Sequence, residues 1–408
     1  MKKKSKILLS AYACEPNKGS EPEVGWKWAI TLSQLGHEVY VITRLNNKKN
    51  IEQFLDEKKI TNLHFHYFDY PNWLINIIKG KFNPNSYLYF FIWQIGIFFS
   101  TRSLVKKIKF DFIQHVTFVS LRFPSFLCLY NTPFIFGPVS GGDIIPQQLM
   151  KKFSFYNKFT EFLRILSNKY IKISPLMNLT FFKSNKILVN NSETKKLIPI
   201  KYHYKVEEML AVGIDKSTTK EIKLDKYNKI FNICFAGNLI ELKGISIVLK
   251  TFLRLKEKNN NIKLTIMGSG PYKAKFIKEA IKYQIDNDIT WLGKIERNKV
   301  LSVFKNSDLL LYPALRDSGG FVVLEALSQS LPVATLNIGG PGQIVDNECG
   351  IKISVNKKNE NEIIFELSSE IEKLINNKDI IDHKRKKSLE KINDFNWENK
   401  VLRLYKQL

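Results

Sequence analysis

The sequence predicts an α/β protein built from two doubly wound domains. At 408 residues the chain exceeds the usual size of one core. Short apolar runs rich in β-branched residues alternate with longer segments of helical period, which is typical of parallel sheets with crossover helices. Residues 216–229 are polar and lack apolar periodicity, which indicates a linker. We expect an N-terminal domain at 1–213, the linker at 214–230, a C-terminal domain at 231–391, and a helix at 392–408 that packs back on the body.

The strands are expected where short apolar runs lie between helical segments. In the first domain these are residues 5–12, 37–43, 62–70, 111–118, 132–138, 185–191 and 207–215. In the second domain they are residues 230–237, 262–268, 289–293, 308–314 and 331–337. Ligands of doubly wound sheets bind beyond the carboxyl ends of the strands. We therefore expect the functional site in a cleft between the two domains.

The composition favours anionic partners and a reducing compartment. Lys and Arg number 63 against 38 Asp and Glu, a net charge of +25, which suits nucleotides, nucleic acid or an anionic membrane. Lysine is spread along the whole chain, so a general compositional bias explains the charge equally well. The four cysteines form no CxxC pair or disulfide framework, which favours the cytoplasm. No recognised nucleic-acid motif is found, and we expect no nucleic-acid partner.

Two segments share features with signal peptides or membrane-spanning helices. Residues 1–16 lack the cleavage site of a signal peptide and read as a first strand. Residues 82–101 are uncharged but include several polar residues, so a helix buried in or docked on the protein is expected rather than a span. Aromatic residues at 87–99 and 151–159, together with lysines, suit peripheral contact with the inner face of the cell membrane. These aromatic side chains suit a protein core equally well.

The segment 315–327, LRDSGGFVVLEAL, places two acids across a glycine turn at the start of a helix. The free N–H groups of a helix start and its dipole favour an anion. Helix capping explains Asp317 or Ser318 but not Glu325, which lies inside an apolar helix. A carboxylate there is costly unless it is paired or functional. The spacing predicts a sugar-nucleotide site, with a structural ion pair as the alternative.

At this motif the sequence resembles the retaining glycosyltransferases of family four, which have the GT-B fold of two Rossmann-like domains. Their signature is an acid, seven residues and a Glu, and DSGGFVVLE differs only in its first acid, Asp317. The N-terminal glycine loop, GNLIELKG at 237–244, LNIGGPG at 336–342 and the C-terminal helix extend the resemblance over nearly the whole chain. The resemblance implies that Glu325 holds the ribose hydroxyls of the donor and Asp317 the transferred sugar.

The resemblance assigns further donor contacts in the second domain. Ser318 and the backbone of Gly319, Gly320 and Phe321 meet the sugar and phosphate. Lys243 neutralises the leaving diphosphate, because preorganised cations supply the largest catalytic term there.

The family usually has an Arg five residues before this Lys, but position 238 is Asn238, which can donate only a neutral hydrogen bond. Arg316 or Lys294, each next to a predicted strand end, is our hypothesis for the missing charge.

The first domain is expected to contribute a glycine loop. Gly19 offers its N–H group to the donor, and Ser20 and Glu21 border the acceptor. Gly141, in the paired glycines that end residues 134–143, is expected to border the acceptor too, with a tight turn as the equal alternative. The alternative for Ser20 is helix capping, with Glu23 as its partner. The loop lacks a GxGxxG fingerprint, which argues against a dinucleotide oxidoreductase.

His115 ends a predicted strand, and the resemblance implies that it contacts the reacting sugar. The alternative is a histidine bonded within a loop. Together with Lys243 and Asp317 it completes the expected catalytic set.

Residues 286–288, DND, imitate a metal motif but only separate a helix from a strand, so no metal and no cofactor are expected. A hydrolase would place two carboxylates across the scissile bond; here we expect front-face attack without a covalent intermediate.

The expected function is transfer of a sugar from a nucleotide diphosphate sugar to a glycan or lipid-linked acceptor in surface polysaccharide synthesis. The alternatives are a nucleotide-sugar epimerase of the same fold and a non-enzymatic protein that binds polyanions or membranes.

Overall fold

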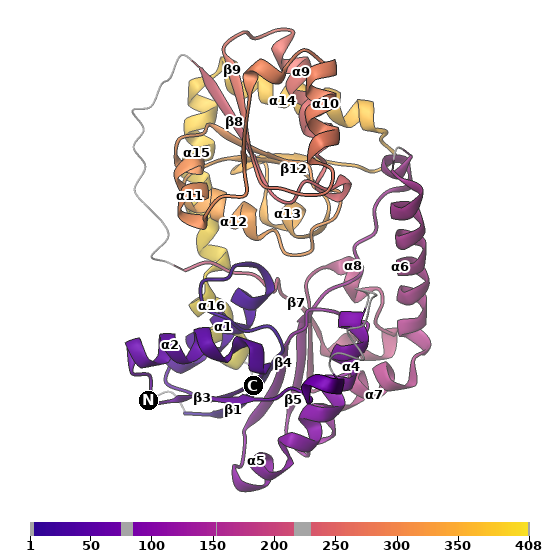
Figure 1. Cartoon of the computed structure of the whole chain (residues 1–408), viewed down its shortest axis with the longest axis vertical. Helices are drawn as coiled ribbons and strands as arrows, with labels where there is room; N and C mark the ends of the chain where they lie inside the picture. Colours follow the sequence, from indigo (N-terminus) through magenta and orange to yellow (C-terminus); the bar gives the residue numbers. More distant parts are fainter. Residues whose placement is uncertain (1–3, 75–84, 152, 216–229, 407–408) are drawn as a thin grey trace. The chain divides into compact units, whose positions relative to one another are not determined.

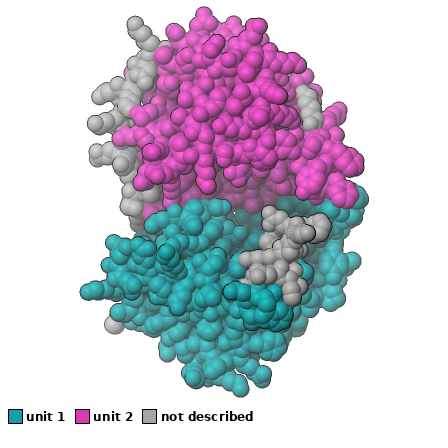
Figure 2. Space-filling view, viewed as in Figure 1, with its two compact units in different colours: residues 1–142, 162–212, 397–408 teal, residues 143–161, 213–396 magenta. Residues whose placement is uncertain are grey.

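The computed structural model describes residues 4–74, 85–151, 153–215 and 230–406. The chain forms two compact units, coloured separately in Figure 2. Unit 1 comprises residues 1–142, 162–212 and 397–408, and unit 2 comprises residues 143–161 and 213–396. The predicted linker spans residues 214–230, of which 216–229 lie outside the described residues.

Unit 1 is organised by a seven-stranded parallel sheet in the order β3-β2-β1-β4-β5-β6-β7 (Figure 1). Its strands are β1 Lys6–Ala11, β2 Glu38–Thr43, β3 Leu63–Tyr67, β4 Phe112–Thr117, β5 Phe134–Val139, β6 Lys186–Val189 and β7 Val206–Glu208. The order of strand addition reverses between β1 and β4. In a doubly wound sheet this reversal is where ligands bind.

Helices of the first half connect these strands. They are α1 Ser20–Gln34, α2 Lys48–Lys58, α4 Asn85–Ser100, α5 Arg102–Lys107, α6 Phe155–Ile173, α7 Pro175–Lys183 and α8 Ser192–Lys195. Short 3₁₀ helices are η1 Leu45–Asn47, η2 Phe126–Leu129, η3 Gln147–Met150 and η4 Ile200–Lys205.

The stretch Tyr87–Lys107 is long and apolar enough to cross a membrane, by length and composition alone. Phe90, Trp93 and Ile97 of α4 nevertheless lie in the core of unit 1, so the expectation of a docked helix is confirmed.

Unit 2 contains a six-stranded parallel sheet in the order β10-β9-β8-β11-β12-β13. Its strands are β8 Phe231–Ala236, β9 Ile262–Met267, β10 Ile289–Gly293, β11 Leu309–Tyr312, β12 Val333–Leu336 and β13 Gly350–Ile353. Its helices are η6 Glu241–Lys243, α9 Ile245–Lys256, α10 Lys273–Lys282, η7 Asp286–Asp288, α11 Arg297–Lys305, α12 Phe321–Ser328, α13 Gly339–Ile344, α14 Glu360–Asn376, α15 Lys378–Ile392 and η8 Asn393–Phe395. The reversal of strand order falls between β8 and β11. Two Rossmann-like domains are thus present, as predicted.

The sheets differ from the sequence prediction at two edges. The strand β13 was missed, because its sequence GIKI is only four residues long and contains a lysine. The strand expected at 207–215 is β7, Val206–Glu208, so its predicted extent was wrong. Beyond Glu208 the backbone leaves the sheet, and the N–H of Ala211 donates to the side chain of Asn190 at 2.8 Å.

The C-terminal helix α16, Trp397–Lys406, belongs to unit 1. Trp397 meets Trp28 of α1 edge to face, with ring centroids 6.3 Å apart. The Lys400 side chain is buried, and its Nζ donates to the carbonyl oxygens of Leu210 (2.8 Å) and Val212. Burial lowers the pKa of Lys400 to about 7, and the positive charge of Arg403 adds to this effect. An amine that is about half protonated at pH 7 therefore ties α16 to the segment after β7.

The substitution Lys400→Met should flatten the pH dependence of stability. The unfolded chain binds a proton at this lysine up to a pKa of about 10.4, whereas the folded chain loses it near pH 7. The free energy of unfolding of the wild type should therefore rise from pH 7 towards pH 10, by up to about 1.4 kcal/mol per pH unit from this group. Urea unfolding at pH 7, 8 and 9 measures the difference. Lys406→Met, at an exposed position, is the control; parallel curves for wild type and Lys400→Met would contradict the assignment.

Candidate functional site

The two loops at the switch point of unit 2 are in direct backbone contact. One follows β8 and includes Lys243 and Gly244, and the other follows β11 from Pro313 onwards. Gly244 has φ 73°, and a Cβ there would lie 2.1 Å from the Pro313 carbonyl oxygen. The N–H of Leu315 donates to the carbonyl of Leu242 at 2.9 Å. The sheet order thus joins segments about 70 residues apart in sequence.

Lys243, Tyr312 and Asp317 form one hydrogen-bonded cluster at this point. Lys243 Nζ lies 2.8 Å from both Tyr312 OH and Asp317 Oδ2. Tyr312, the last residue of β11, donates its hydroxyl to Asp317 Oδ2 at 2.6 Å. Asp317 Oδ1 accepts from the N–H groups of Gly319 and Gly320, each at 3.1 Å. The four acceptor positions of the carboxylate are all used.

The charge states of this cluster follow from its burial and its partners. Burial alone would raise the pKa of Asp317, but Lys243, Tyr312 and Gly320 together hold it below its usual value. Burial and the Asp317 carboxylate raise the pKa of Tyr312 well above 10. Tyr312 therefore stays a neutral donor to the ionised Asp317 and an acceptor for the Lys243 ammonium.

The turn before α12 is built by close backbone contacts. Gly320, with φ 70°, is the N-cap of α12, and no side chain caps the helix. The N–H of Gly340 donates to the Asp317 carbonyl at 2.8 Å, and a Cβ on Gly340 would lie 2.6 Å from the backbone of Gly319. The N–H groups of Phe321 and Val322 have no acceptor within the helix, whereas those of Val323 and Leu324 donate to the Gly320 carbonyl at 3.0 and 3.2 Å. This is the geometry that binds anions at helix N-termini.

Glu325 is paired with a cation that sequence reasoning missed. Arg297 Nε donates to Glu325 Oε1 at 2.6 Å, and the Glu325 side chain is 12% exposed. The Arg297 guanidinium carbon lies 5.5 Å from the centroid of the Phe321 ring. Arg297 and Tyr312, both unassigned by the sequence, lie at or just beyond the carboxyl ends of strands, which is the signal that could have identified them.

The structure also locates the other cations considered for the donor. Arg316 forms an ion pair with Glu161 within unit 2. Lys294 and Asn238 are exposed. Lys243 is thus the cation that directly contacts the acid–glycine motif.

The DND sequence forms η7, where Asp288 pairs with Lys256 (2.8 Å) and Lys263 (2.7 Å). Among the described residues, no group of three His, Cys, Asp or Glu side chains is arranged to hold a metal.

In unit 1, the expected glycine loop leads into α1. Gly19, with φ 68°, is the N-cap and no side chain caps the helix, so the alternative of a Ser20 cap is wrong. Glu23 Oε2 accepts from the N–H of Gly19 at 3.4 Å. Glu21 accepts a hydrogen bond from the N–H of Val119, just beyond β4. Burial raises the pKa of Glu21.

His115 lies inside unit 1. It is 1% exposed, and Nε2 donates to the carbonyl of Phe118 at 3.1 Å. The rings of Phe90 and Phe136 pack near it, with centroids 6.3 and 5.3 Å away. Burial lowers the pKa of His115 to about 4, so the imidazole is neutral. In this arrangement His115 supports the loop after β4 and is not open to a substrate.

Gly141, with φ 137°, lies in the loop after β5. Its carbonyl oxygen accepts from Arg122 (2.9 Å), Arg164 (3.0 Å) and Asn168 (3.1 Å). Gly141 thus connects the loop to the polar side of α6.

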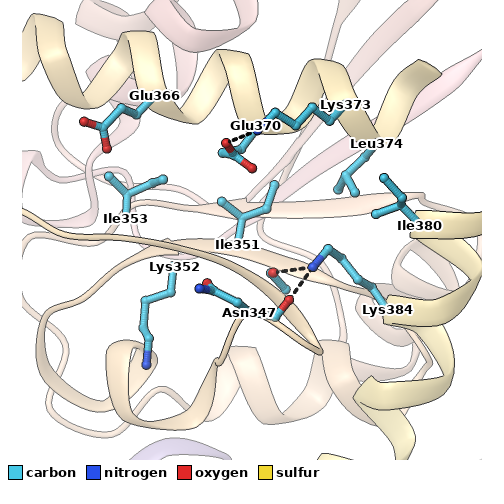
Figure 3. A pocket seen from close by; sticks show the side chains of 11 residues that line it. Asn347, Ile351, Lys352, Ile353, Glu366, Glu370, Lys373, Leu374, Ile380 and Lys384 are labelled. Atoms are coloured by element: carbon cyan, nitrogen blue, oxygen red, sulfur yellow. Dashed lines mark hydrogen bonds and ion pairs between the residues drawn. The ribbon is translucent and has the colours of Figure 1, made fainter. Parts of the chain in front are cut away.

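A separate cavity of about 510 Å³ lies between β13, α14 and α15 (Figure 3). Ile351, Ile353 and Leu374 supply apolar lining, and Lys384 donates to the carbonyl oxygens of Gly350 (3.0 Å) and Asn347. None of the residues predicted for donor or acceptor lines it.

The fold is GT-B: two Rossmann-like domains, the second with a glycine turn and a helix start at its switch point. Residues 216–391 match the family described as "Glycosyl transferases group 1". Over 157 residues, 38% of this chain and 40% of the relative, the sequence is 31% identical to Protein CapJ of Staphylococcus aureus. The chain thus spans about two fifths of that relative.

Solved structures of similar fold cover nearly the whole chain. The lipopolysaccharide outer core galactosyltransferase WaaB, in its apo form, has a TM-score of 0.64 at 13% identity and covers 99% of this chain and 100% of its own. HepE of Anabaena in complex with UDP-glucose has a TM-score of 0.60 at 12% identity, with coverage of 99% and 100%. At these identities the likeness concerns the fold.

Tyr312→Phe should destabilise unit 2 by about 1–3 kcal/mol, because Asp317 and Lys243 lose a buried partner. Urea unfolding measures the loss, and a double-mutant cycle with Asp317→Asn should give a coupling of about 0.5–3 kcal/mol. Tyr204→Phe, at an 81% exposed position, is the control and should change stability by less than about 0.5 kcal/mol. Strict additivity of Tyr312→Phe and Asp317→Asn would contradict the cluster.

Proposed function

We propose that the protein is a retaining glycosyltransferase that moves a sugar from a nucleoside diphosphate sugar to a glycan or lipid-linked acceptor. The observation that carries the proposal is the cluster of Lys243, Tyr312 and Asp317 at the start of α12. It combines a held cation with free helix N–H groups, which suits a diphosphate. The match to glycosyl transferases group 1 and the fold shared with HepE, solved with UDP-glucose, support this proposal.

Lys243 would stabilise the leaving group. As the bond between the anomeric carbon and the diphosphate oxygen breaks, its electron pair leaves with the phosphate, and negative charge grows there. A cation already held in place stabilises this charge without reorganisation. The neutral hydroxyl of Tyr312 positions Lys243 and leaves its charge intact. Asp317 holds Lys243 and the N–H groups of Gly319 and Gly320, so the diphosphate would share Lys243 with Asp317.

The surroundings of Asp317 favour front-face attack over a covalent intermediate. Its lone pairs face Lys243, Tyr312, Gly319 and Gly320, so the carboxylate is held by its own chain and is poorly disposed to act as a nucleophile. The acceptor hydroxyl would bond to the anomeric carbon on the face the diphosphate leaves. Its proton would pass to the departing phosphate oxygen.

Glu325 would accept hydrogen bonds from the ribose diol of the donor. Its Oε1 already accepts a hydrogen bond from Arg297, which fixes the orientation of the carboxylate. In unit 1, Gly19 would face the donor, while Ser20, Glu21 and Gly141 would border the acceptor. His115 would act as a positioning residue through Phe118. We place the protein in the cytoplasm at the inner membrane face and expect no metal requirement.

The substitution Lys243→Ala should lower sugar transfer by about 10²–10³-fold, because one preorganised charge is lost at the leaving group. The assay uses a panel of UDP-, GDP- and TDP-sugars with glycan and lipid-linked acceptors, in buffer containing EDTA. Lys282→Ala, at an exposed lysine of α10, is the control and should match the wild type. Unchanged transfer in Lys243→Ala would refute the assignment. Conversion of the donor without acceptor would instead indicate an epimerase.

The anomeric configuration of the product provides a separate test of the mechanism. Attack on the face left by the diphosphate should give a product with the same anomeric configuration as the donor sugar. Proton NMR of the anomeric signal during early turnover measures this directly. An inverted anomer would rule out the retaining mechanism while leaving sugar transfer itself intact.

A further inference from the structure

The helix α6 shows its apolar side to the outside. Phe162, Leu166, Tyr170 and Ile173 recur at intervals of three or four residues and are between 45% and 74% exposed. We call these four residues the outer face of α6. Ile171 lies buried on the other side. A surface helix of a globular protein normally buries such a stripe.

The inner side of α6 is mostly polar and satisfied by hydrogen bonds within unit 1. Arg122 donates to Ser167 Oγ at 2.9 Å and also bonds to Asn168. Arg164 and Asn168 donate to the carbonyl of Gly141 at 3.0 and 3.1 Å. These bonds fix the rotation of the helix about its axis. The outer face therefore stays exposed because turning it inward would break the polar contacts.

The segment from α6 to the end of η4 is strongly basic. Residues 162–205 contain nine basic residues and one acidic residue. Lys169 and Lys172 are exposed on α6 itself. Basic residues beside an apolar helix face are typical of helices that lie in a membrane interface.

A second group of exposed aromatic side chains lies on α7 and η4. Phe182 is 63% exposed and Tyr204 is 81% exposed. Lys205 Nζ lies 6.0 Å from the ring centroid of Phe182 and 5.6 Å from that of Tyr204. Aromatic rings next to lysine are common at the level of lipid headgroups. The helix α7, which begins two residues after α6 ends, connects this cluster to the outer face (Figure 1).

We propose that the outer face of α6, with the cluster of Phe182, Tyr204 and Lys205, docks on an anionic lipid bilayer. The four apolar side chains would enter the interface, and the lysines would contact the headgroup phosphates. From Phe162 to Ile173 the stripe is about 16 Å long, which suits a helix lying along a membrane rather than across it. The charge excess favours anionic lipid over a second copy of this basic chain. The surface uses none of the donor-site residues. The inference rests on the proposed location at the inner membrane face and assigns to it the surface that makes the contact.

Vesicle sedimentation of the full chain tests the proposal. The wild type should sediment with vesicles of phosphatidylcholine and phosphatidylglycerol and much less with phosphatidylcholine alone. The triple variant Phe162→Ser, Tyr170→Ser and Ile173→Ser should bind the anionic vesicles about tenfold more weakly or worse. Unchanged binding of this variant, or no binding by the wild type, overturns the proposal.

A matched control removes three exposed apolar side chains elsewhere. The variant Leu45→Ser, Ile281→Ser and Leu292→Ser should bind vesicles like the wild type; an equal loss would mean that no particular face docks. The charge variant Lys169→Glu and Lys172→Glu keeps the apolar stripe and should lose the preference for anionic vesicles. Sedimentation velocity without lipid detects self-association. Dissociation of an oligomer by the triple variant, without an effect on vesicle binding, would identify a protein interface instead.

A labelling experiment detects insertion without removing the stripe. The four native cysteines are buried, so an added surface cysteine can be labelled selectively. A polarity-sensitive dye on Leu166→Cys should shift to shorter emission wavelength with anionic vesicles. The same dye on Ile281→Cys should not shift. Equal responses at the two positions would contradict docking through α6. Because neither experiment requires donor turnover, their outcome is separate from that of the transfer assays.

Discussion

The loops at the switch point of the second unit depend on a partner of opposite charge for Lys243, which lies where the sheet reverses its strand order. A largely buried ammonium is tolerated only with a partner of opposite charge, and Asp317 supplies it for Lys243. Tyr312 remains neutral between them because burial and the carboxylate oppose its ionisation. The same carboxylate holds the N–H groups of Gly319 and Gly320. One side chain thus links the cation, the strand end and the helix start.

This arrangement gives the shorter acid a physical role. With Asp in the first position of the motif, the carboxylate folds back onto its own turn, where it accepts from residues two and three positions later. The glycines of LNIGGPG serve the same turn by close backbone packing, since a side chain at Gly339 would lie 2.3 Å from the carbonyl of Asp317. They support the turn by packing against its backbone, and the N–H groups of Phe321 and Val322 at the start of α12 are the ones that we propose for the ligand.

The first unit uses its polar groups differently. Around β4 and β5, hydrogen bonds hold loops in place: Glu21 binds Val119, His115 binds Phe118, and Gly141 gathers three donors. These bonds place polar side chains of α6 inward and leave its apolar side outward. The apolar side of α6 faces outward. We therefore attribute its apolar side chains to contact with an apolar environment rather than to packing in the core of unit 1.

Sequence alone determined the alternation of strands and helices, the two domains and the acid–glycine–acid motif at a helix start, because these follow from local periodicity and turn chemistry. It left open whether Glu325 is paired, and it gave no role to Arg297 or Tyr312. The contacts of Arg297 with Glu325 and of Tyr312 with Lys243 join segments that are separate in the sequence and meet only through the order of strands in the sheet. It left open whether the aromatic residues at 151–159, which include the start of α6, belong to a core or to a surface. Only the tertiary structure decides this, because helix rotation depends on partners far away in the chain, here Arg122 and Gly141.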